Sequence, residues 1–261
     1  MVKQLSVKNT IKWFSNELNV NNQKVILGLT TFCFDISVLE YMLAFTNGAT
    51  LVVVNSSTQK DPQRLIEIIN DYNVNIFQAT PTTYEMLLMW GWSGNASLDM
   101  LVGGEAFRPK LLELVNNCRS IRNVYGPTET TIWSSSYNLK NVASILDAKK
   151  PIPIGTPISE TEFYIVDVES PSSWKQVPRC AEGELFIGGV GVAAGYLHAP
   201  DLTKDKFIQN PFGDGVVYRT GDIVKESESD SNVFYFTRRL DDQVKVGGHR
   251  IELQEIESVY L

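Results

Sequence analysis

Residues 50–77 read TLVVVNSSTQKDPQRLIEIINDYNVNIF, and this stretch decides the fold. Its two ends, Thr50–Val54 and Val74–Phe77, are short, apolar and partly β-branched, as buried strands are. Between them the sequence predicts a helix with Asp61 as N-cap and Pro62 at the first helical position. The apolar residues that follow share one helical face: Leu65, Ile68, Ile69 and Tyr72. The stretch therefore predicts a buried strand, an amphipathic helix and a second buried strand.

The same alternation extends outward on both sides of this unit. Three more short apolar runs predict strands: Val25–Leu29, Leu98–Val102 and Ile121–Tyr125. Segments of helical period fill the gaps, among them Val38–Phe45, where Ser37 and Glu40 have the spacing of a capping box. Because such alternation is typical of βα units, residues 6–135 predict a largely parallel, doubly wound subdomain.

After Pro151 the pattern changes to strands alone. Strand-like runs separated by Gly, Pro, Asp and Ser turns occupy Glu162–Val168, Gly183–Ile187, Val216–Val224 and Val233–Thr237. We therefore expect an α/β fold in which a small β-rich, barrel-like subdomain follows the parallel one. The expected ranges are 1–145 for the α/β subdomain, 146–240 for the β-rich subdomain, and 241–261 for a hinge and the start of a further subdomain.

The composition of the 261 residues excludes several classes of protein. The net charge of −7 argues against a protein that grips nucleic acid or an anionic membrane surface. The three cysteines are widely spaced and lack a CxxC pair, so we expect neither a disulfide framework nor a zinc site. No apolar run approaches the length of a transmembrane helix, and the first residues lack the apolar core of a signal peptide. We expect a cytoplasmic protein with no nucleic-acid or membrane partner.

Two loops that follow predicted strands carry candidate binding residues, because ligands of parallel sheets bind at the carboxyl ends of the strands. Gly103-Gly104-Glu105-Ala106 offers a backbone that can approach a flat ligand closely, although a Gly pair also marks an ordinary tight turn. The loop Tyr125–Thr131 sets hydroxyls and a carboxylate after a Gly-Pro bend, which suits phosphate oxygens and Mg²⁺. The alternative for Thr128 and Glu129 is an N-terminal cap on a following helix.

Two further segments carry charged groups that suit a nucleotide. Tyr218–Asp222 ends a strand with a carboxylate that can accept hydrogen bonds from a ribose diol. Arg239, Asp241 and Asp242 add a guanidinium and two acids. Taken singly, each segment also fits a turn or a surface ion pair.

Five motifs in order make a more specific pattern than any single loop. They are Phe34–Ser37, Asn123–Thr131, Gly183–Gly189, Tyr218–Asp222 and Asp241–Glu257. In sequence and spacing they resemble the adenylation domain of nonribosomal peptide synthetases, within the adenylate-forming superfamily, and the resemblance covers the chain from residue 7 onward.

The resemblance implies a reaction and its cofactors. Family members activate an amino acid with ATP and Mg²⁺, release pyrophosphate and pass the aminoacyl group to the phosphopantetheine thiol of a peptidyl-carrier domain. The implied catalytic residues are Thr128, which would donate to the α-phosphate, and Glu129, which would also hold Mg²⁺. Asp241 would be the hinge.

The resemblance also implies how the nucleotide is bound. Tyr125 would stack on adenine, and Asp222 would accept hydrogen bonds from the ribose hydroxyls with help from Arg239. The full set implied for ATP and AMP is Gly103, Gly104, Glu105, Ala106, Tyr125, Gly126, Thr128, Asp222 and Arg239.

A pocket for a small amino acid is implied in the same way. Asp35 would pair with the α-ammonium group of the substrate; its other reading is the N-cap of the helix at Val38–Phe45, where Ser37 and Glu40 already provide a capping box. The implied pocket residues are Asp35, Ile36, Leu39, Gln78, Leu101, Gly103, Val124, Ile132 and Trp133. This set resembles the signature of glycine-activating domains, and its bulky apolar members would fill the space of a substrate side chain. Trp133 is either a pocket wall or ordinary core.

Two other functions stay open at this point. A carboxylic-acid:CoA ligase of the same superfamily would usually lack an acid at Asp35, and a non-catalytic adenine-nucleotide-binding module is the third reading. The family's phosphate-gripping loop and C-terminal lysine lie outside this sequence, so we expect the chain alone to be inactive or weak. The apolar residues of Glu252–Leu261 lie at helical spacing without a partner, so we expect that segment to be poorly packed and the chain to continue in the intact protein.

Overall fold

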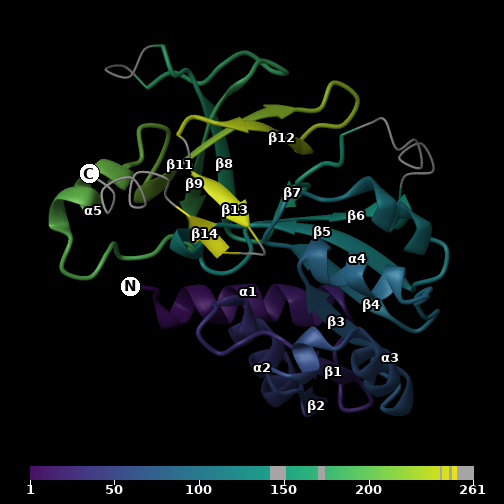
Figure 1. Cartoon of the computed structure of the whole chain (residues 1–261). Coiled ribbons are helices and arrows are strands. Elements are labelled where there is room, and N and C mark those ends of the chain that lie inside the picture. The colour runs from purple at the N-terminus through teal and green to yellow at the C-terminus, as the bar shows by residue number, and fades with distance from the viewer. Residues whose placement is uncertain (142–150, 170–173, 242, 247–248, 252–261) are drawn as a thin grey trace, which may run out of the picture. The chain divides into compact units, whose positions relative to one another are not determined.

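The computed structural model describes residues 1–141, 151–169, 174–241, 243–246 and 249–251 (Figure 1). The chain forms two compact units that are interleaved in sequence. The unit we call parallel comprises Ile11–Val124 and Tyr137–Ile152, and the unit we call antiparallel comprises Met1–Thr10, Tyr125–Ser136 and Pro153–Leu261. The consecutive domain ranges 1–145, 146–240 and 241–261 stay a prediction. The expected helix at Glu252–Leu261 lies outside the described residues.

Five parallel strands make up the first part of a seven-stranded sheet, which continues with β6 (Ser135–Asn138) and β7 (Thr156–Pro157). The five are β1 (Val25–Gly28), β2 (Thr50–Val53), β3 (Ile76–Ala79), β4 (Asp99–Gly103) and β5 (Ser120–Tyr125), and their spatial order is β2-β1-β3-β4-β5. The accompanying helices are α1 (Gln4–Glu17), which begins in the other unit, α2 (Ile36–Asn47), α3 (Pro62–Asp71) and α4 (Pro81–Met89). Short 3₁₀ turns lie at η1 (Thr58–Lys60), η2 (Pro109–Leu114) and η4 (Leu139–Asn141). The predicted parallel α/β subdomain is confirmed.

The helix α3 starts as its sequence predicts. Asp61 is the N-cap, and its carboxylate accepts a 3.0 Å hydrogen bond from the backbone N–H of Arg64. The predicted apolar face is wrong at Tyr72, which ends the helix as C-cap and is 57% exposed. The following strand begins at Ile76 rather than Val74, because the Val74 N–H still donates to Ile69 in the helix.

Thr50–Val53 is a strand, but the prediction that it is buried is wrong. β2 lies at the edge of this sheet and pairs only with β1 among the described strands, so Val53 is 59% exposed. Apolar, β-branched composition therefore identified the strand and not its position in the sheet.

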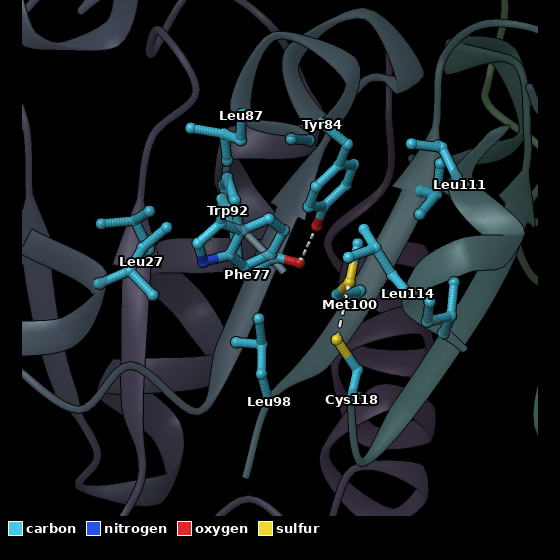
Figure 2. Close-up of a cluster of buried hydrophobic side chains, with 14 of the residues drawn as sticks. Leu27, Phe77, Tyr84, Leu87, Trp92, Leu98, Met100, Leu111, Leu114 and Cys118 are labelled. Carbon is cyan, nitrogen blue, oxygen red and sulfur yellow. Dashed lines mark hydrogen bonds between the residues drawn. The ribbon is translucent and has the colours of Figure 1, made fainter. Parts of the chain in front are cut away.

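The core of the parallel unit packs around an aromatic cluster (Figure 2). The rings of Phe77 on β3 and Tyr84 on α4 meet edge to face at 4.8 Å, and the ring of Trp92 stacks on Tyr84 at 6.3 Å. The buried Tyr84 hydroxyl donates a 2.6 Å hydrogen bond to the Phe77 carbonyl, as the dashed line in Figure 2 shows. This contact ties α4 to the strand that carries Gln78.

The antiparallel unit contains a separate sheet, as its strand-only sequence predicts. Its strands are β8 (Thr161–Val166), β9 (Gly183–Gly189), β10 (Phe207–Gln209), β11 (Val216–Glu226) and β12 (Phe234–Arg239), in the order β10-β11-β9-β8 with β12 beside β11. The other elements are η3 (Thr128–Thr130), the first half of β6, β7, α5 (Pro200–Lys206) and the hairpin of β13 (Val244–Val246) and β14 (His249–Ile251). The Phe186, Leu185 and Ile187 side chains of β9 are fully buried on its two faces.

Candidate functional site

The strand order of the parallel unit marks where a ligand would bind. The chain passes from β1 outward to β2 and returns to β3 on the other side of β1, so β1 and β3 are neighbours at the point where the order reverses. Ligands of such sheets bind outside the carboxyl ends of the strands at this switch point. The segments that follow β1 and end β3 carry Asp35 and Gln78, two of the predicted pocket residues.

Asp35 occupies the N-cap position of α2 without capping it. Its backbone already has helical angles, φ −58 and ψ −28, and its carboxylate makes no capping hydrogen bond. The capping role that competes with substrate binding is therefore not used. Two other predicted pocket residues, Ile36 and Leu39, follow in the first turn and are buried.

The predicted capping box is wrong. Ser37 lies inside the first turn of α2 rather than at the N-cap, and Glu40 turns inward. The carboxylate of Glu40 accepts hydrogen bonds from the Thr30 N–H at 3.1 Å, from the Thr30 hydroxyl at 2.6 Å and from the Gln78 amide at 3.1 Å. Burial raises the pKa of Glu40 from 4.5 to about 7, although the hydrogen bonds from Thr30, Gln78 and Leu29 act to lower it.

Strand register brings further predicted pocket residues together. Gln78 on β3 is paired with Leu101 on β4, and Gly103 on β4 is paired with Val124 on β5. Gln78 also donates a 2.8 Å hydrogen bond to the Ile36 carbonyl at the start of α2. Within the parallel unit the structure thus groups Ile36, Gln78 and Leu101, each of which is buried.

The Gly103–Ala106 segment is shaped by one glycine and one ion-paired cluster. Gly104 has a φ of +82°, which favours glycine. The Glu105 carboxylate accepts 2.7 Å and 3.4 Å hydrogen bonds from Thr82 and Arg108, so its side chain is committed to the α4 end of the sheet. Only the backbone of this segment is therefore suited to meet a flat ligand.

The loop Tyr125–Ser134 of the antiparallel unit closes on itself. The Ser134 N–H donates to the Tyr125 carbonyl at 2.8 Å, and a Cβ on Gly126 would lie 2.6 Å from the Cα of Trp133. Thr131 and Ile132 both have a φ of 68°, an unfavourable conformation for branched residues. The predicted residues Ile132 and Trp133 are thereby held in place, and both are buried.

Thr128 and Glu129 do not cap a helix. They form the single 3₁₀ turn η3, whose N-cap is Pro127, and the next element is a strand. Thr128 is exposed, whereas Glu129 is buried and its carboxylate accepts a 2.6 Å hydrogen bond from the hydroxyl of Tyr196. The Ala193 N–H donates to the Glu129 carbonyl at 2.9 Å, so the 193–196 segment holds the residue at both ends.

The Glu129 carboxylate and the Thr128 hydroxyl suit a Mg²⁺ ion that is bound together with phosphate oxygens. Among the described residues no three His, Cys, Asp or Glu side chains gather as a metal cage. Mg²⁺ at nucleotide sites is commonly bound by one or two carboxylates together with phosphate oxygens. A single buried Glu129 beside an exposed hydroxyl therefore suits a Mg²⁺ that arrives with a nucleotide.

A continuous chain of polar contacts runs through the antiparallel unit. The Tyr125 hydroxyl donates to Oδ2 of Asp222 at 2.5 Å, and Arg239 donates to Oδ1 of Asp222 at 2.6 Å. The same guanidinium grips Asp241 with two hydrogen bonds of 2.6 and 2.7 Å. Four predicted site residues thus meet, and strand register accounts for one of the contacts because it pairs Asp222 on β11 with Arg239 on β12.

The electrostatics of this chain favour the charged ion pairs. Burial acts to lower the pKa of Arg239, but its bonds and charge interactions with Asp241 and Asp222 raise it above its usual range. Burial acts to raise the pKa of Asp241, and Arg239 outweighs it, so the net pKa is lowered. Burial and the Asp222 charge raise the pKa of Tyr125, which keeps its hydroxyl a donor.

Two site features were missed by the sequence. Nothing in the local pattern indicated that Tyr196 holds Glu129, because the two residues are 67 positions apart. Glu40 was predicted to belong to a capping box with Ser37, although a glutamate inside the largely apolar run Ile36–Leu43 is a signal of a buried carboxyl. No helix of the described residues is long and apolar enough to span a membrane.

Comparisons with known proteins all match this chain to AMP-binding enzymes and nonribosomal peptide synthetases. A family profile described as AMP-binding enzyme matches residues 1–197. The chain is 38% identical over 262 residues to a dimodular nonribosomal peptide synthase of Bacillus subtilis, covering 99% of this chain and 11% of that protein. The chain therefore spans about a tenth of the length of that relative.

Two solved structures are similar over almost the whole chain. One is a four-domain holo nonribosomal peptide synthetase bound to AMP and glycine, 40% identical with a TM-score of 0.81, covering 97% of this chain and 19% of that one. The other is the Vibrio cholerae adenylation domain AlmE in complex with glycyl-adenosine-5'-phosphate, 27% identical with a TM-score of 0.86, covering 99% of this chain and 48% of that one.

Proposed function

We propose that this chain, which belongs to the AMP-binding enzyme family and matches adenylation regions of nonribosomal peptide synthetases, activates glycine as glycyl-AMP at the expense of ATP. The observation that carries the proposal is the grouping of Tyr125, Asp222 and Arg239 by hydrogen bonds of 2.5 and 2.6 Å. A carboxylate fixed between a phenol and a guanidinium suits a ribose diol below an adenine ring.

The nucleotide half of the proposed reaction uses the antiparallel unit. Tyr125 stacks on adenine, and Asp222, which Arg239 orients, accepts hydrogen bonds from the ribose hydroxyls. The backbone of Gly103–Ala106 together with Gly126 borders the base. Thr128 donates to the α-phosphate, and Glu129 holds Mg²⁺, which neutralises phosphate charge when bound. The exposure of the Thr128 side chain supports its contact with phosphate, and the burial of Glu129 and its hydrogen bond from Tyr196 support a fixed metal ligand.

The amino-acid half of the reaction starts from Asp35, whose carboxylate pairs with the substrate's α-ammonium group. The substrate carboxylate then attacks the α-phosphorus. A new oxygen–phosphorus bond forms, the bond to the bridging oxygen of the β-phosphate breaks, and pyrophosphate leaves with the electron pair. Such in-line displacement depends chiefly on positioning and charge neutralisation.

Glycine is the proposed substrate because the pocket that the resemblance implies is rich in bulky apolar residues, which would fill the space of a substrate side chain. Ile36, Leu39, Leu101, Ile132 and Trp133 are bulky, apolar and buried. Two structural relatives support the assignment, since one is bound to AMP and glycine and the other to glycyl-adenosine-5'-phosphate. The product would pass to the phosphopantetheine thiol of a peptidyl-carrier domain, in the cytoplasm where ATP is available.

Amino-acid-dependent exchange of labelled pyrophosphate into ATP, measured on the full-length protein with a panel of amino acids, tests this function. We expect exchange with glycine above all others. Preferred exchange with leucine or phenylalanine would overturn glycine and leave adenylation intact. ATP binding without exchange for any amino acid would favour the non-catalytic reading, and exchange only with acids that lack an α-amino group would favour a CoA ligase.

A further inference from the structure

Glu40 is a buried carboxylate that has no role in the proposed reaction as described so far. It is 2% exposed, and its two oxygens accept the three hydrogen bonds from Thr30 and Gln78 described above. Burying a carboxylate is costly unless it is well bonded. The three hydrogen bonds offset the cost of burying the Glu40 carboxylate, which indicates that the carboxylate has a specific role in the parallel unit.

The place of Glu40 in the fold connects it to the proposed pocket. Thr30 follows β1, Gln78 belongs to β3, and Glu40 itself comes from α2. β1 and β3 are the neighbouring strands at the switch point of the sheet. One carboxylate therefore joins the loop after β1, the end of β3 and the helix α2 at the edge where ligands of such sheets bind.

The amide of Gln78 extends the same network to the start of α2. Its nitrogen donates both to Glu40, at 3.1 Å, and to the Ile36 carbonyl, at 2.8 Å. Ile36 and Glu40 are one helical turn apart, so this amide clamps the first turn of the helix. The residues of that turn include Leu39, and Asp35 directly precedes it.

We propose that Glu40 is a positioning residue for the amino-acid end of the site: it fixes Gln78 and the first turn of α2 so that Asp35, Ile36 and Leu39 form a pocket for an amino acid as small as glycine. The inference rests on the proposed function and adds to it a determinant of substrate size. Glu40 acts through Gln78 and does not itself touch the substrate.

The test is Glu40→Gln in the full-length protein, read by pyrophosphate exchange. This substitution preserves the shape of the side chain but replaces one acceptor oxygen with an amide donor, which then faces a donor of Thr30 or Gln78. We expect the KM for glycine to rise about tenfold and the KM for ATP to change less than about twofold, as for the loss of a buried hydrogen-bonded pair. The preference for glycine over alanine should fall by a similar factor. Glu67→Gln, on the exposed face of α3, is the matched control and should change neither.

Coupling to Gln78 separates this role from a merely structural one. Because Glu40 acts through Gln78, the effects of Glu40→Gln and Gln78→Ala on the glycine KM should be far from additive in the double variant. If Glu40→Gln does not fold, Thr30→Val replaces it, since it removes the hydroxyl donor and keeps the N–H donor to the carboxylate. We expect Thr30→Val to raise the glycine KM about threefold with an unchanged ATP KM.

Each outcome is decisive. Three results would overturn the role of Glu40: a folded Glu40→Gln protein with an unchanged glycine KM, KM values for glycine and ATP that rise in parallel, or additive effects with Gln78→Ala. In each case, exchange by the unmutated protein would still uphold the proposed function. Absence of amino-acid-dependent exchange in the unmutated protein would overturn the proposed function and this role with it.

Discussion

The hydroxyl of Tyr125 donates a 2.5 Å hydrogen bond to Oδ2 of Asp222, although the two residues are 97 positions apart. Arg239 binds the other oxygen of Asp222 at 2.6 Å, so each oxygen already has one fixed partner and keeps acceptor capacity for another. A carboxylate held in this way is oriented before a ligand arrives. The proposed adenosine site depends on this orientation.

Asp222→Ala should weaken ATP binding. The change removes the acceptor for the ribose and leaves the Tyr125 hydroxyl without its partner, so we expect a loss of roughly 1–3 kcal/mol in the binding free energy of ATP. Titration calorimetry of the full-length protein with ATP measures it. Asp230→Ala, on an exposed loop, is the control. An ATP affinity equal to that of the unmutated protein would remove Asp222 from the site.

Tyr196→Phe should raise the Mg²⁺ requirement of the exchange reaction. The ring keeps its edge contact with Phe207, at 5.3 Å between centroids, but the 2.6 Å hydrogen bond to Glu129 is lost. A less constrained carboxylate should need several times more Mg²⁺ for half-maximal rate, as for other residues that orient a metal ligand. Mn²⁺ binding followed by electron paramagnetic resonance gives a second readout. The control is Tyr164→Phe, whose hydroxyl donates to Glu162 at 2.8 Å and accepts from Asn210 at 3.4 Å, with no bond to Glu129. Equal metal dependence in both variants would contradict the role of Tyr196.

Gly126→Ala should destabilise the protein. The new Cβ would lie 2.6 Å from the Cα of Trp133 and 2.7 Å from the Ile132 carbonyl oxygen, both of which belong to a closed loop. We expect the free energy of unfolding to fall by about 1–3 kcal/mol, as for other overpacked sites. Gly91→Ala, which meets nothing within 4 Å but has a φ of +81°, measures the cost of strain alone. Chemical denaturation measures both variants. Because Gly126 is not among the glycines with a positive φ, a Gly126→Ala protein as stable as the unmutated one would show that no clash exists there.

The pH dependence of stability should carry the signature of Glu40. Burial, opposed by bonds from Thr30, Gln78 and Leu29, raises the pKa of this carboxyl from 4.5 in the ordinary state to about 7 in the folded state. Between these values the folded protein binds more protons than the unfolded chain. The free energy of unfolding therefore falls as pH rises through this window, by up to roughly 3 kcal/mol for this group.

Glu40→Gln should flatten that slope, since glutamine does not titrate. Urea unfolding at pH values from about 4.5 to 7.5 measures the slope in the variant and in the Glu67→Gln control. The same slope in all three proteins would show that Glu40 does not titrate in this window.

Trp133→Ala should change substrate choice if Trp133 is a pocket wall. Removing the large indole would admit larger apolar amino acids, whose steric exclusion by a wall can be stricter than the 1–3 kcal/mol or so that one methylene contributes. Pyrophosphate exchange with alanine, valine and leucine measures the change. A variant that folds less stably but keeps the glycine preference would identify Trp133, which is 2% exposed, as core.

The local signals of the sequence predicted the elements of the fold well. Asp61 and Pro62 started α3 as expected, because an N-cap and a proline at the first turn act within four residues. The five strand runs were found because apolar, β-branched segments of this length pack best in a sheet. The edge position of β2 could not be predicted, since it depends on which strands the chain places beside it.

The site was predicted where the family resemblance implies a role for the residue. Asp222 and Arg239 were expected together on resemblance, and strand register explains why they meet. The Glu40 network joins residues 10 and 38 positions apart, and the Tyr196 bond to Glu129 spans 67 positions. No local pattern encodes such distances, so the buried carboxylate was misread as a helix cap.

The central claim is that the glycine carboxylate attacks the α-phosphorus of ATP, and oxygen transfer tests it most directly. The full-length protein is incubated with ATP, Mg²⁺ and glycine labelled with ¹⁸O in its carboxylate, and hydroxylamine is added to intercept the acyl group. Hydroxylamine cleaves the bond between the acyl carbon and the bridging oxygen, so that oxygen stays with the nucleotide. Mass spectrometry should find one ¹⁸O atom in the AMP released, with pyrophosphate unlabelled. Release of ADP and phosphate, or AMP without ¹⁸O, would contradict the account.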